Sequence, residues 1–291
     1  MRRLVFCCVA FVFLLAAADQ AHAGRWRYAD PRQLGLYPVG HSVFDAVEPA
    51  RDDRRLRVEM WYPADPFLVV ARNRPLDVSF LIDLMLARSR DPNDEFYAKI
   101  NARALGVAGH SFGGFTALAA ASGFHVPAEG IDIPPDPRVR AIVPASGILS
   151  DLELQSIHLT VLIVSGTFDT TTPIETQTTR PWALIPSRPF YRADIVGATY
   201  LRFANVCDIG QALLDIGVKL ADLSRLGLDY LGSCLPPALD ISVVREAANL
   251  YITTFLKKHL LHDSRYGEFL TPEYAQASEP NLMFQRQEEV Q

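Results

Sequence analysis

Apolar and polar positions recur with two different periods along this chain, and each period predicts its own kind of element. The runs 41–47 and 56–62 are β-branched or alternate between apolar and polar residues, with Asp52 and Asp53 between them. This pattern predicts an N-terminal antiparallel hairpin. Further along, short apolar runs take turns with segments of helical spacing, which predicts βαβ units. We therefore expect an α/β fold, with a mostly parallel sheet and helices on both faces.

The same patterns place the individual elements. The segment after Thr271 is polar, and we expect it to pack loosely. The expected strands cover 67–70, 105–108, 139–144, 161–164 and 193–196, and the expected helices cover 78–88, 112–122 and 243–261.

The N-terminus carries the pattern of a secretory signal. Arg2 and Arg3 precede an apolar stretch over 4–18, and the stretch is followed by Ala21-His22-Ala23. The alternative is an uncleaved membrane anchor, but that stretch is shorter than the roughly 20 residues that a spanning helix needs. We expect residues 1–23 to be removed, the mature chain 24–291 to form one domain without a transmembrane span, and the protein to be secreted or periplasmic.

The charge of the chain restricts its class of partner, and its cysteine content indicates a disulfide. The chain has 28 basic and 33 acidic residues, a net charge of −5, and it has no basic stripe, so we expect no nucleic-acid partner. Cys7 and Cys8 lie in the signal, which leaves Cys207 and Cys234 in an oxidising compartment. These two cysteines are candidates for a disulfide, and two separate buried thiols are the alternative.

A candidate nucleophile follows the expected strand 105–108. Gly109-His110-Ser111-Phe112-Gly113 matches the pattern G-x-S-x-G, in which a serine occupies a sharp turn between a strand and a helix. The residues two before and two after it must be small because strand and helix crowd together there. We expect Ser111 to be the nucleophile and the backbone N–H of Phe112 to contribute to an oxyanion hole, and we do not interpret His110 as the base.

A candidate acid lies at the end of a later strand. Asp169 follows the expected strand 161–164, and catalytic groups of open α/β sheets collect at the carboxyl ends of strands. A serine followed in the chain by an aspartate is also the order of a Ser-Asp-His triad. The alternative is an aspartate that caps the turn before Thr170.

Several segments together resemble one family of enzymes. The chain resembles secreted bacterial relatives of platelet-activating factor acetylhydrolase, often labelled dienelactone-hydrolase-like, over most of its mature length. The segments that carry the resemblance are Tyr37-Pro38-Val39-Gly40, Val58-Glu59-Met60-Trp61-Tyr62-Pro63, Gly109-His110-Ser111-Phe112-Gly113-Gly114, Gly166-Thr167-Phe168-Asp169 and Gly197-Ala198-Thr199.

The resemblance implies the α/β-hydrolase fold over 24–291 and a serine ester hydrolase without metal or cofactor. In that family Ser111 would attack the acyl carbonyl of a short-acyl or lipid-like ester, and a histidine after the last parallel strand would accept its proton. Asp169 would orient that histidine. A dienelactone hydrolase in the narrow sense would carry cysteine at the position of Ser111.

The chain departs from that family at the position of the base. Tyr200 stands where the resemblance implies histidine. A phenol with a pKa near 10 is ionised in only about one molecule in a thousand at pH 7, so it is no resting general base. The alternative function is therefore a catalytically impaired relative of these hydrolases that acts as a binding protein.

The region before the nucleophile is also shortened. Only residues 71–104 separate the expected strands 67–70 and 105–108, which is room for one helical crossover but not for two βα units. We expect the sheet to lack a central strand and the oxyanion segment to be shortened. Either the neighbouring strands close the gap or the region is unstable.

Overall fold

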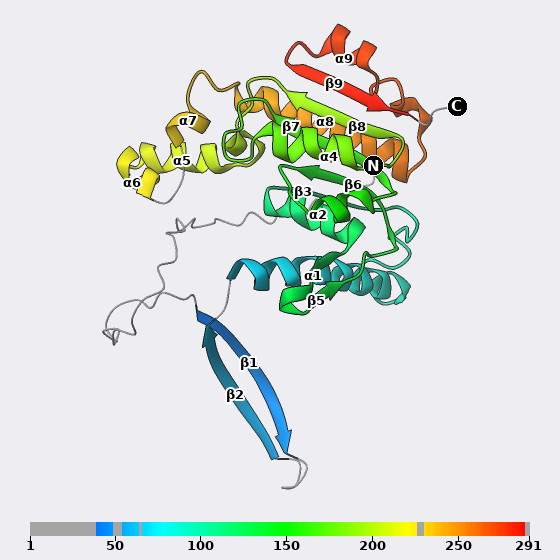
Figure 1. The fold of residues 1–291 in the computed structure, drawn as a ribbon, viewed down its shortest axis with the longest axis vertical. Helices are drawn as coiled ribbons and strands as arrows, with labels where there is room; N and C mark the ends of the chain where they lie inside the picture. Colours follow the sequence, from blue (N-terminus) through cyan, green and yellow to red (C-terminus); the bar gives the residue numbers. More distant parts are fainter. Residues whose placement is uncertain (1–38, 49–53, 64–65, 226–229, 289–291) are drawn as a thin grey trace.

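The described part of the chain forms three β-sheets, with helices packed around the largest of them (Figure 1). A computed structural model describes residues 39–48, 54–63, 66–225 and 230–288. The expected signal peptide 1–23 and the turn residues Asp52 and Asp53 lie outside the described residues.

The largest sheet has five strands in the order β3-β6-β7-β8-β9. The first four run parallel, and β9 runs antiparallel to β8. The predicted α/β class, with a mostly parallel sheet flanked by helices, is therefore confirmed. The strands are β3 (Leu105–His110), β6 (Val139–Ala145), β7 (Thr160–Gly166), β8 (Phe190–Ile195) and β9 (Leu282–Gln287).

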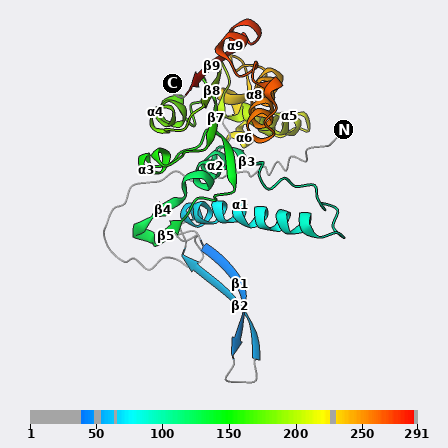
Figure 2. The same ribbon diagram turned by 90° about the vertical axis from the view of Figure 1, so that its right-hand side faces the viewer.

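Helices cover both faces of this sheet, because alternate residues of each strand point to opposite sides. Ile163 of β7 joins an apolar cluster with α2, α3 and α4, whereas Leu162 joins another with α8. Figure 2 shows α3 and α4 on one side of β7 and α8 on the other. The helices here are α2 (Phe112–Ser122), α3 (Asp151–Gln155), α4 (Arg180–Leu184) and α8 (Ile241–Leu260).

The strand before Ser111 is the last in its sheet. Among the described strands, β3 pairs with β6 alone. Its residues Gly106 and Ala108 are exposed, whereas β7 is buried along almost its whole length. The sheet therefore stops at the strand that carries the candidate nucleophile, at the place where the sequence predicted a missing strand.

Two short sheets lie outside the large one. The predicted N-terminal hairpin is present as β1 (Val39–Glu48) and β2 (Arg54–Pro63), and it forms a separate two-stranded sheet that projects from the rest (Figure 1). A second pair, β4 (Phe124–Val126) and β5 (Ile131–Ile133), follows α2.

The expected strand 67–70 is wrong. These residues form the start of α1 (Pro66–Arg90), and Phe67 is 59% exposed. A short apolar run fits a buried helix turn as well as a strand, and Pro66 is favourable at the first helical position. The helical spacing predicted for 78–88 therefore continues upstream through Pro75, and the helix ends at Arg90 before Pro92.

The segment after Thr271 was expected to pack loosely, and this is also wrong. It forms α9 (Pro272–Ser278) and then β9, the closing strand of the sheet. Leu282 and Phe284 are buried, with exposed Met283 between them. This alternation is the period of a strand with one buried face, within a stretch whose composition is polar.

The region between β8 and α8 is closed by a covalent bond. Cys207 and Cys234 form a disulfide, with their Cα atoms 5.4 Å apart. The bond joins the first and last of three short helices, α5 (Val206–Asp215), α6 (Leu220–Arg225) and α7 (Tyr230–Cys234). Within the described ranges, no helix is both long and apolar enough to cross a membrane.

Candidate functional site

Ser111 stands alone between β3 and α2 in a strained backbone conformation. Its φ is 59° and its ψ is −119°, a combination that costs a non-glycine residue free energy. The turn is held from both sides: the Ser111 N–H donates to Ala145 O at 2.8 Å, and Ser111 O accepts from Phe115 N at 3.0 Å. The side chain is thereby presented at the carboxyl end of the sheet.

The glycines of the motif allow backbones to approach closely. A Cβ on Gly109 would lie 2.5 Å from the Gly113 carbonyl, and a Cβ on Gly114 would lie 2.4 Å from Ala145 O. Both distances are too short for any side chain. The packing of α2 against β3 and β6 therefore requires Gly109 and Gly114. A Cβ on Gly113 would meet nothing within 4 Å, so the crowding expected two residues after Ser111 is wrong for Gly113 itself.

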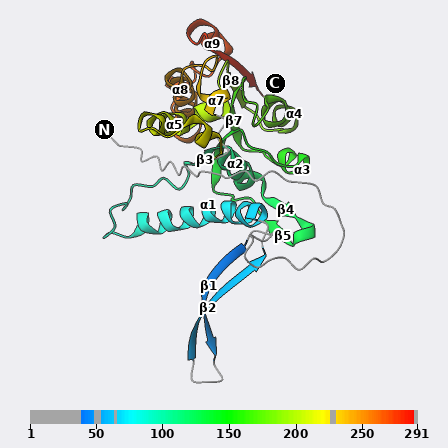
Figure 3. The same ribbon diagram turned by 90° about the vertical axis from the view of Figure 1, so that its left-hand side faces the viewer.

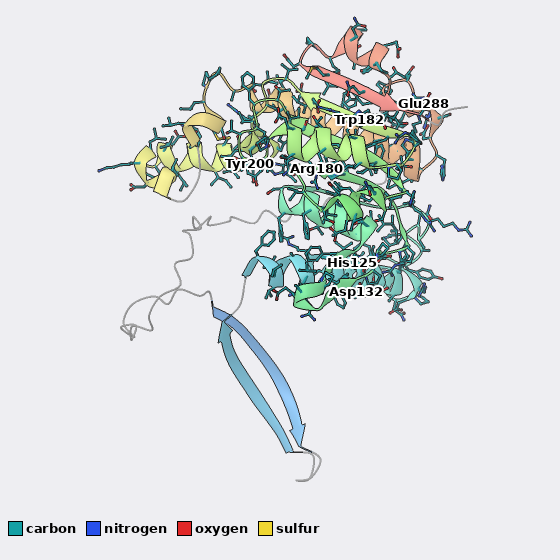
Figure 4. All side chains as sticks on the ribbon, in the orientation of Figure 1. His125, Asp132, Arg180, Trp182, Tyr200 and Glu288 are labelled. Atoms are coloured by element: carbon teal, nitrogen blue, oxygen red, sulfur yellow. A yellow bond between two sulfur atoms is a disulfide. The ribbon has the colours of Figure 1, made fainter. Side chains whose placement is uncertain are left out.

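Tyr200 reaches Ser111 from the other side of the site. It begins a short 3₁₀ helix (Tyr200–Phe203) after β8, and its hydroxyl donates a hydrogen bond to Ser111 Oγ (Figure 4 labels its side chain). Burial raises the pKa of the Tyr200 phenol, the charge of Asp169 raises it further, and the bond to Ser111 acts in the opposite direction. The phenol therefore remains protonated at neutral pH and serves as a hydrogen-bond donor.

Asp169 follows β7 and has its own set of donors. Its Oδ1 accepts from the backbone N–H groups of Thr171 and Thr172 at 2.9 and 2.7 Å. Its Oδ2 accepts from the hydroxyls of Thr172 at 2.5 Å and Ser146 at 3.2 Å. The carboxylate is buried and well satisfied, so it is fixed in place close to the Tyr200 phenol.

The structure thus brings Ser111, Asp169 and Tyr200 into one cluster. Sequence reasoning missed Ser146 and Thr172, which hold the carboxylate. Ser146 directly follows β6, whose carboxyl end lies at the same edge of the sheet as that of β7. Its position after an expected strand was the available signal, but a serine in a turn is too common to stand out.

The His110 ring packs against the Tyr200 ring. Its ring lies 4.7 Å from the Tyr200 ring and 5.5 Å from the Phe203 ring, measured between centroids. Burial lowers the pKa of His110 to about 4, so the imidazole is neutral at pH 7. Its Nε2 is buried and has no hydrogen-bond partner among the described residues.

Phe112 opens α2, so its backbone N–H lies in the first turn of that helix, where the helix dipole favours a negative charge. Its ring lies 5.5 Å from the Phe67 ring of α1 and 5.1 Å from the Phe115 ring, between centroids. The first turn of α1 therefore lies next to the elbow.

A pocket of about 540 Å³ opens beside the carboxylate rather than over Ser111. It offers hydroxyl groups and small apolar surfaces to a ligand. Its lining residues are Thr167, Phe168, Asp169, Thr170, Thr199, Gly232, Pro237 and Ala238.

Over the part of the chain that the structure describes, no three His, Cys, Asp or Glu side chains converge as metal ligands would.

The chain was also compared with known proteins: no protein-family model matches it, and no curated protein matches it. Assignment of a function therefore rests on the residues of the site themselves.

Proposed function

We propose that this chain is a serine ester hydrolase of the α/β-hydrolase fold, related to platelet-activating factor acetylhydrolase and to dienelactone-hydrolase-like proteins. It would act on short-acyl or lipid-like esters after export from the cytoplasm. The supporting observation is the hydrogen bond that the Tyr200 hydroxyl donates to Ser111 Oγ. It joins the strained elbow to the turn after β8, where a triad base would stand.

The reaction would proceed through an acyl-enzyme. Ser111 Oγ attacks the ester carbonyl and forms a tetrahedral oxyanion, the alcohol leaves with the proton from Ser111, and water then releases the acid. The first turn of α2 stabilises the oxyanion through its backbone dipoles. No metal or cofactor takes part in this scheme.

Tyr200 makes proton transfer the slow step. A neutral phenol that donates to Ser111 Oγ cannot also accept the proton of Ser111, and ionising it would place a phenolate close to Asp169. The proton must pass to water or to the leaving alkoxide. Loss of a triad base has cost about 10⁶-fold in turnover in a serine protease, so slow turnover is expected.

The second candidate is an ester-binding protein without turnover. It is favoured by the raised pKa of Tyr200, because the resting hydrogen bond then stabilises the unreactive Ser111 hydroxyl. The two candidates share a ligand class and differ only in whether the acyl group is transferred to Ser111.

The test is hydrolysis of an activated short-acyl ester by the mature protein, Ser111→Ala, Tyr200→His and Tyr200→Phe. We expect slow hydrolysis that is lost in Ser111→Ala. Tyr200→His should raise the rate by about 10²-fold or more, since a positioned base contributes about that much. Tyr200→Phe is the matched control, because it keeps the ring without adding a base.

A folded Tyr200→His protein no faster than its Ser111→Ala derivative would falsify the hydrolase proposal. A parent that binds the ester without hydrolysis, with activity only in Tyr200→His, would establish the binding protein instead. Circular dichroism of every variant separates loss of activity from loss of fold.

A further inference from the structure

Ser111 has the position of a nucleophile but no base beside it. Among the described residues, Tyr200 is the one hydrogen-bond partner of Ser111 Oγ, and its hydroxyl donates that bond. A serine hydrolase uses its base twice, first for the proton of the serine and then for the proton of the water that releases the acyl group. Both steps lack this help here, but they break bonds to different leaving groups.

Asp169 is not free to replace the base. An ionised carboxylate has about four acceptor positions. The backbone N–H groups of Thr171 and Thr172 occupy Oδ1, and the hydroxyls of Thr172 and Ser146 occupy Oδ2. The Asp169 carboxylate therefore has no acceptor position left for the proton of Ser111 or of a water molecule.

His110 does not replace the base either. Its ring packs against the rings of Tyr200 and Phe203, and its Nε2 is buried without a partner among the described residues. Burial lowers the pKa of His110 to about 4, which makes its imidazole a weak base at neutral pH. The residues around Ser111 thus hold the serine in place without supplying an acceptor for a proton.

We infer that Ser111 is a site of stable acylation, at which the chain takes an acyl group from a donor with a good leaving group and retains it. The inference rests on the proposed function, because it uses Ser111 Oγ as the same nucleophile. It names the donors as aryl esters and thioesters, since alkyl esters react too slowly to load the site. The main product is then the acylated protein, and free acid forms only slowly.

Loading of the site needs no base when the leaving group is weakly basic. Ser111 Oγ forms a bond to the acyl carbon, and the bond from that carbon to the phenolate or thiolate breaks with its electron pair. The proton of Ser111 passes through water to the leaving group. The first turn of α2 stabilises the oxyanion, and the strained elbow already holds the serine in position.

Release of the acyl group is slower than loading for two reasons. The acylated serine is an alkyl ester, and a serine alkoxide leaves far less readily than a phenolate or a thiolate. The attacking group is now a water molecule, and neither Asp169 nor His110 is placed to deprotonate it. The Tyr200 hydroxyl can donate to the leaving oxygen, but a donor does not activate the water.

The retained acyl group has apolar surface to lie against. The pocket of about 540 Å³ opens beside Asp169, which belongs to the same cluster as Ser111. Phe168, Pro237 and Ala238 give the pocket apolar walls. The helices α5 and α7 lie at this end of the sheet (Figure 3), and Gly232 of α7 also lines the pocket. Because the carboxylate is negative, the pocket favours a neutral acyl chain.

The test is intact-mass spectrometry of the mature protein mixed with para-nitrophenyl acetate, with the release of nitrophenol followed in parallel. We expect a burst of nitrophenol equal to the amount of protein and a mass increase of one acetyl group. Loss of that group should be at least about tenfold slower than its gain, since an acyl-enzyme accumulates only when release is the slower step. Ethyl acetate in place of the aryl ester should give no mass increase.

Three variants assign the acetyl group and its retention. Ser111→Ala should show neither the burst nor the mass increase. Tyr200→His should lose the acetyl group about 10²-fold faster than the parent, because a positioned base contributes about that much. Tyr200→Phe is the matched control, which keeps the ring, adds no base and should retain the acetyl group. Circular dichroism checks that each variant is folded.

The outcomes separate this inference from the proposed function. Steady release of nitrophenol that needs Ser111, without any acylated protein, leaves the hydrolase proposal standing and overturns the inference. A mass increase that persists in Ser111→Ala places the acetyl group on another residue and overturns it as well. A parent and a folded Tyr200→His protein that both fail to react overturn the two proposals together.

Discussion

The strands that carry Ser111 and Asp169 end at the same edge of the sheet, but they differ in what surrounds them. β7 lies inside the sheet, between β6 and β8, and it is buried on both faces. β3 has one neighbour among the described strands, and its residues Gly106 and Ala108 are exposed. The carboxylate side of the site is therefore fixed by the core, whereas the serine side depends on α2 and on the bonds of a single turn.

The largest expected effect tests this difference directly. Leu162→Ala in β7 removes a fully buried side chain and should lower the free energy of unfolding by about 2–5 kcal/mol. Val107→Ala in β3 removes a partly buried one and should cost about 1 kcal/mol. Urea denaturation of both variants gives the two values. Equal losses of unfolding free energy would show that packing stabilises β3 as much as β7, which would contradict this difference.

The next effect concerns the hydrogen-bond donors around the Asp169 carboxylate. Asp169→Ala leaves two backbone N–H groups and the hydroxyls of Ser146 and Thr172 without their acceptor, and should cost about 1–3 kcal/mol. Asp208→Ala is the control, because that carboxylate pairs with Arg245 at a half-exposed site and contributes at most about 1 kcal/mol. Thermal unfolding at pH 7 compares the two. A difference near zero would contradict the fixed position of Asp169.

The smallest effect is a pH dependence of folding stability, and it arises on the serine side of the site. Burial lowers the pKa of His110 to about 4, so the unfolded chain takes up a proton below its ordinary pKa near 6.5 and the folded chain does not. The stability that His110 contributes is fully present above pH 6.5 and falls as the pH drops toward 4, and the loss between pH 7 and pH 5.5 is about 1 kcal/mol.

His110→Phe should flatten that profile of melting temperature against pH. His259, whose pKa burial also lowers to about 4, contributes to the same window in both proteins and sets the remaining slope. An identical profile for the parent and His110→Phe would mean that His110 is protonated in the folded protein.

The predictable part of the fold was the part with a continuous local pattern. Residues 161–164 were identified as a strand because every one of them is apolar, and β7 contains them. Residues 67–70 are equally apolar, yet they form a helix. Local pattern does not separate the two cases, because the difference lies in whether a neighbouring strand exists to pair with.

The site followed the same rule. The elbow was visible because steric crowding dictates Gly109 and Gly114 of its pattern, and Asp169 was visible because it follows an expected strand. Ser146 and Thr172 were not visible, since a hydroxyl that bonds a carboxylate looks the same in sequence as one that bonds water. The bond from Tyr200 to Ser111 joins distant segments, and its only sequence signal was the resemblance to a family that carries histidine there.

Two hydrogen bonds connect the disulfide-bonded helix α7 to the residues on either side of Tyr200. On either side of Tyr200, Thr199 Oγ1 donates to Ser233 O at 2.6 Å and an Arg202 guanidinium N–H donates to Cys234 O at 2.6 Å. The covalent closure of α5 onto α7 thereby reduces the conformational entropy of the turn that presents the phenol. The hydrogen bond from the Tyr200 hydroxyl to Ser111 then forms with little further loss of conformational entropy, whether the pair catalyses hydrolysis or binds a ligand.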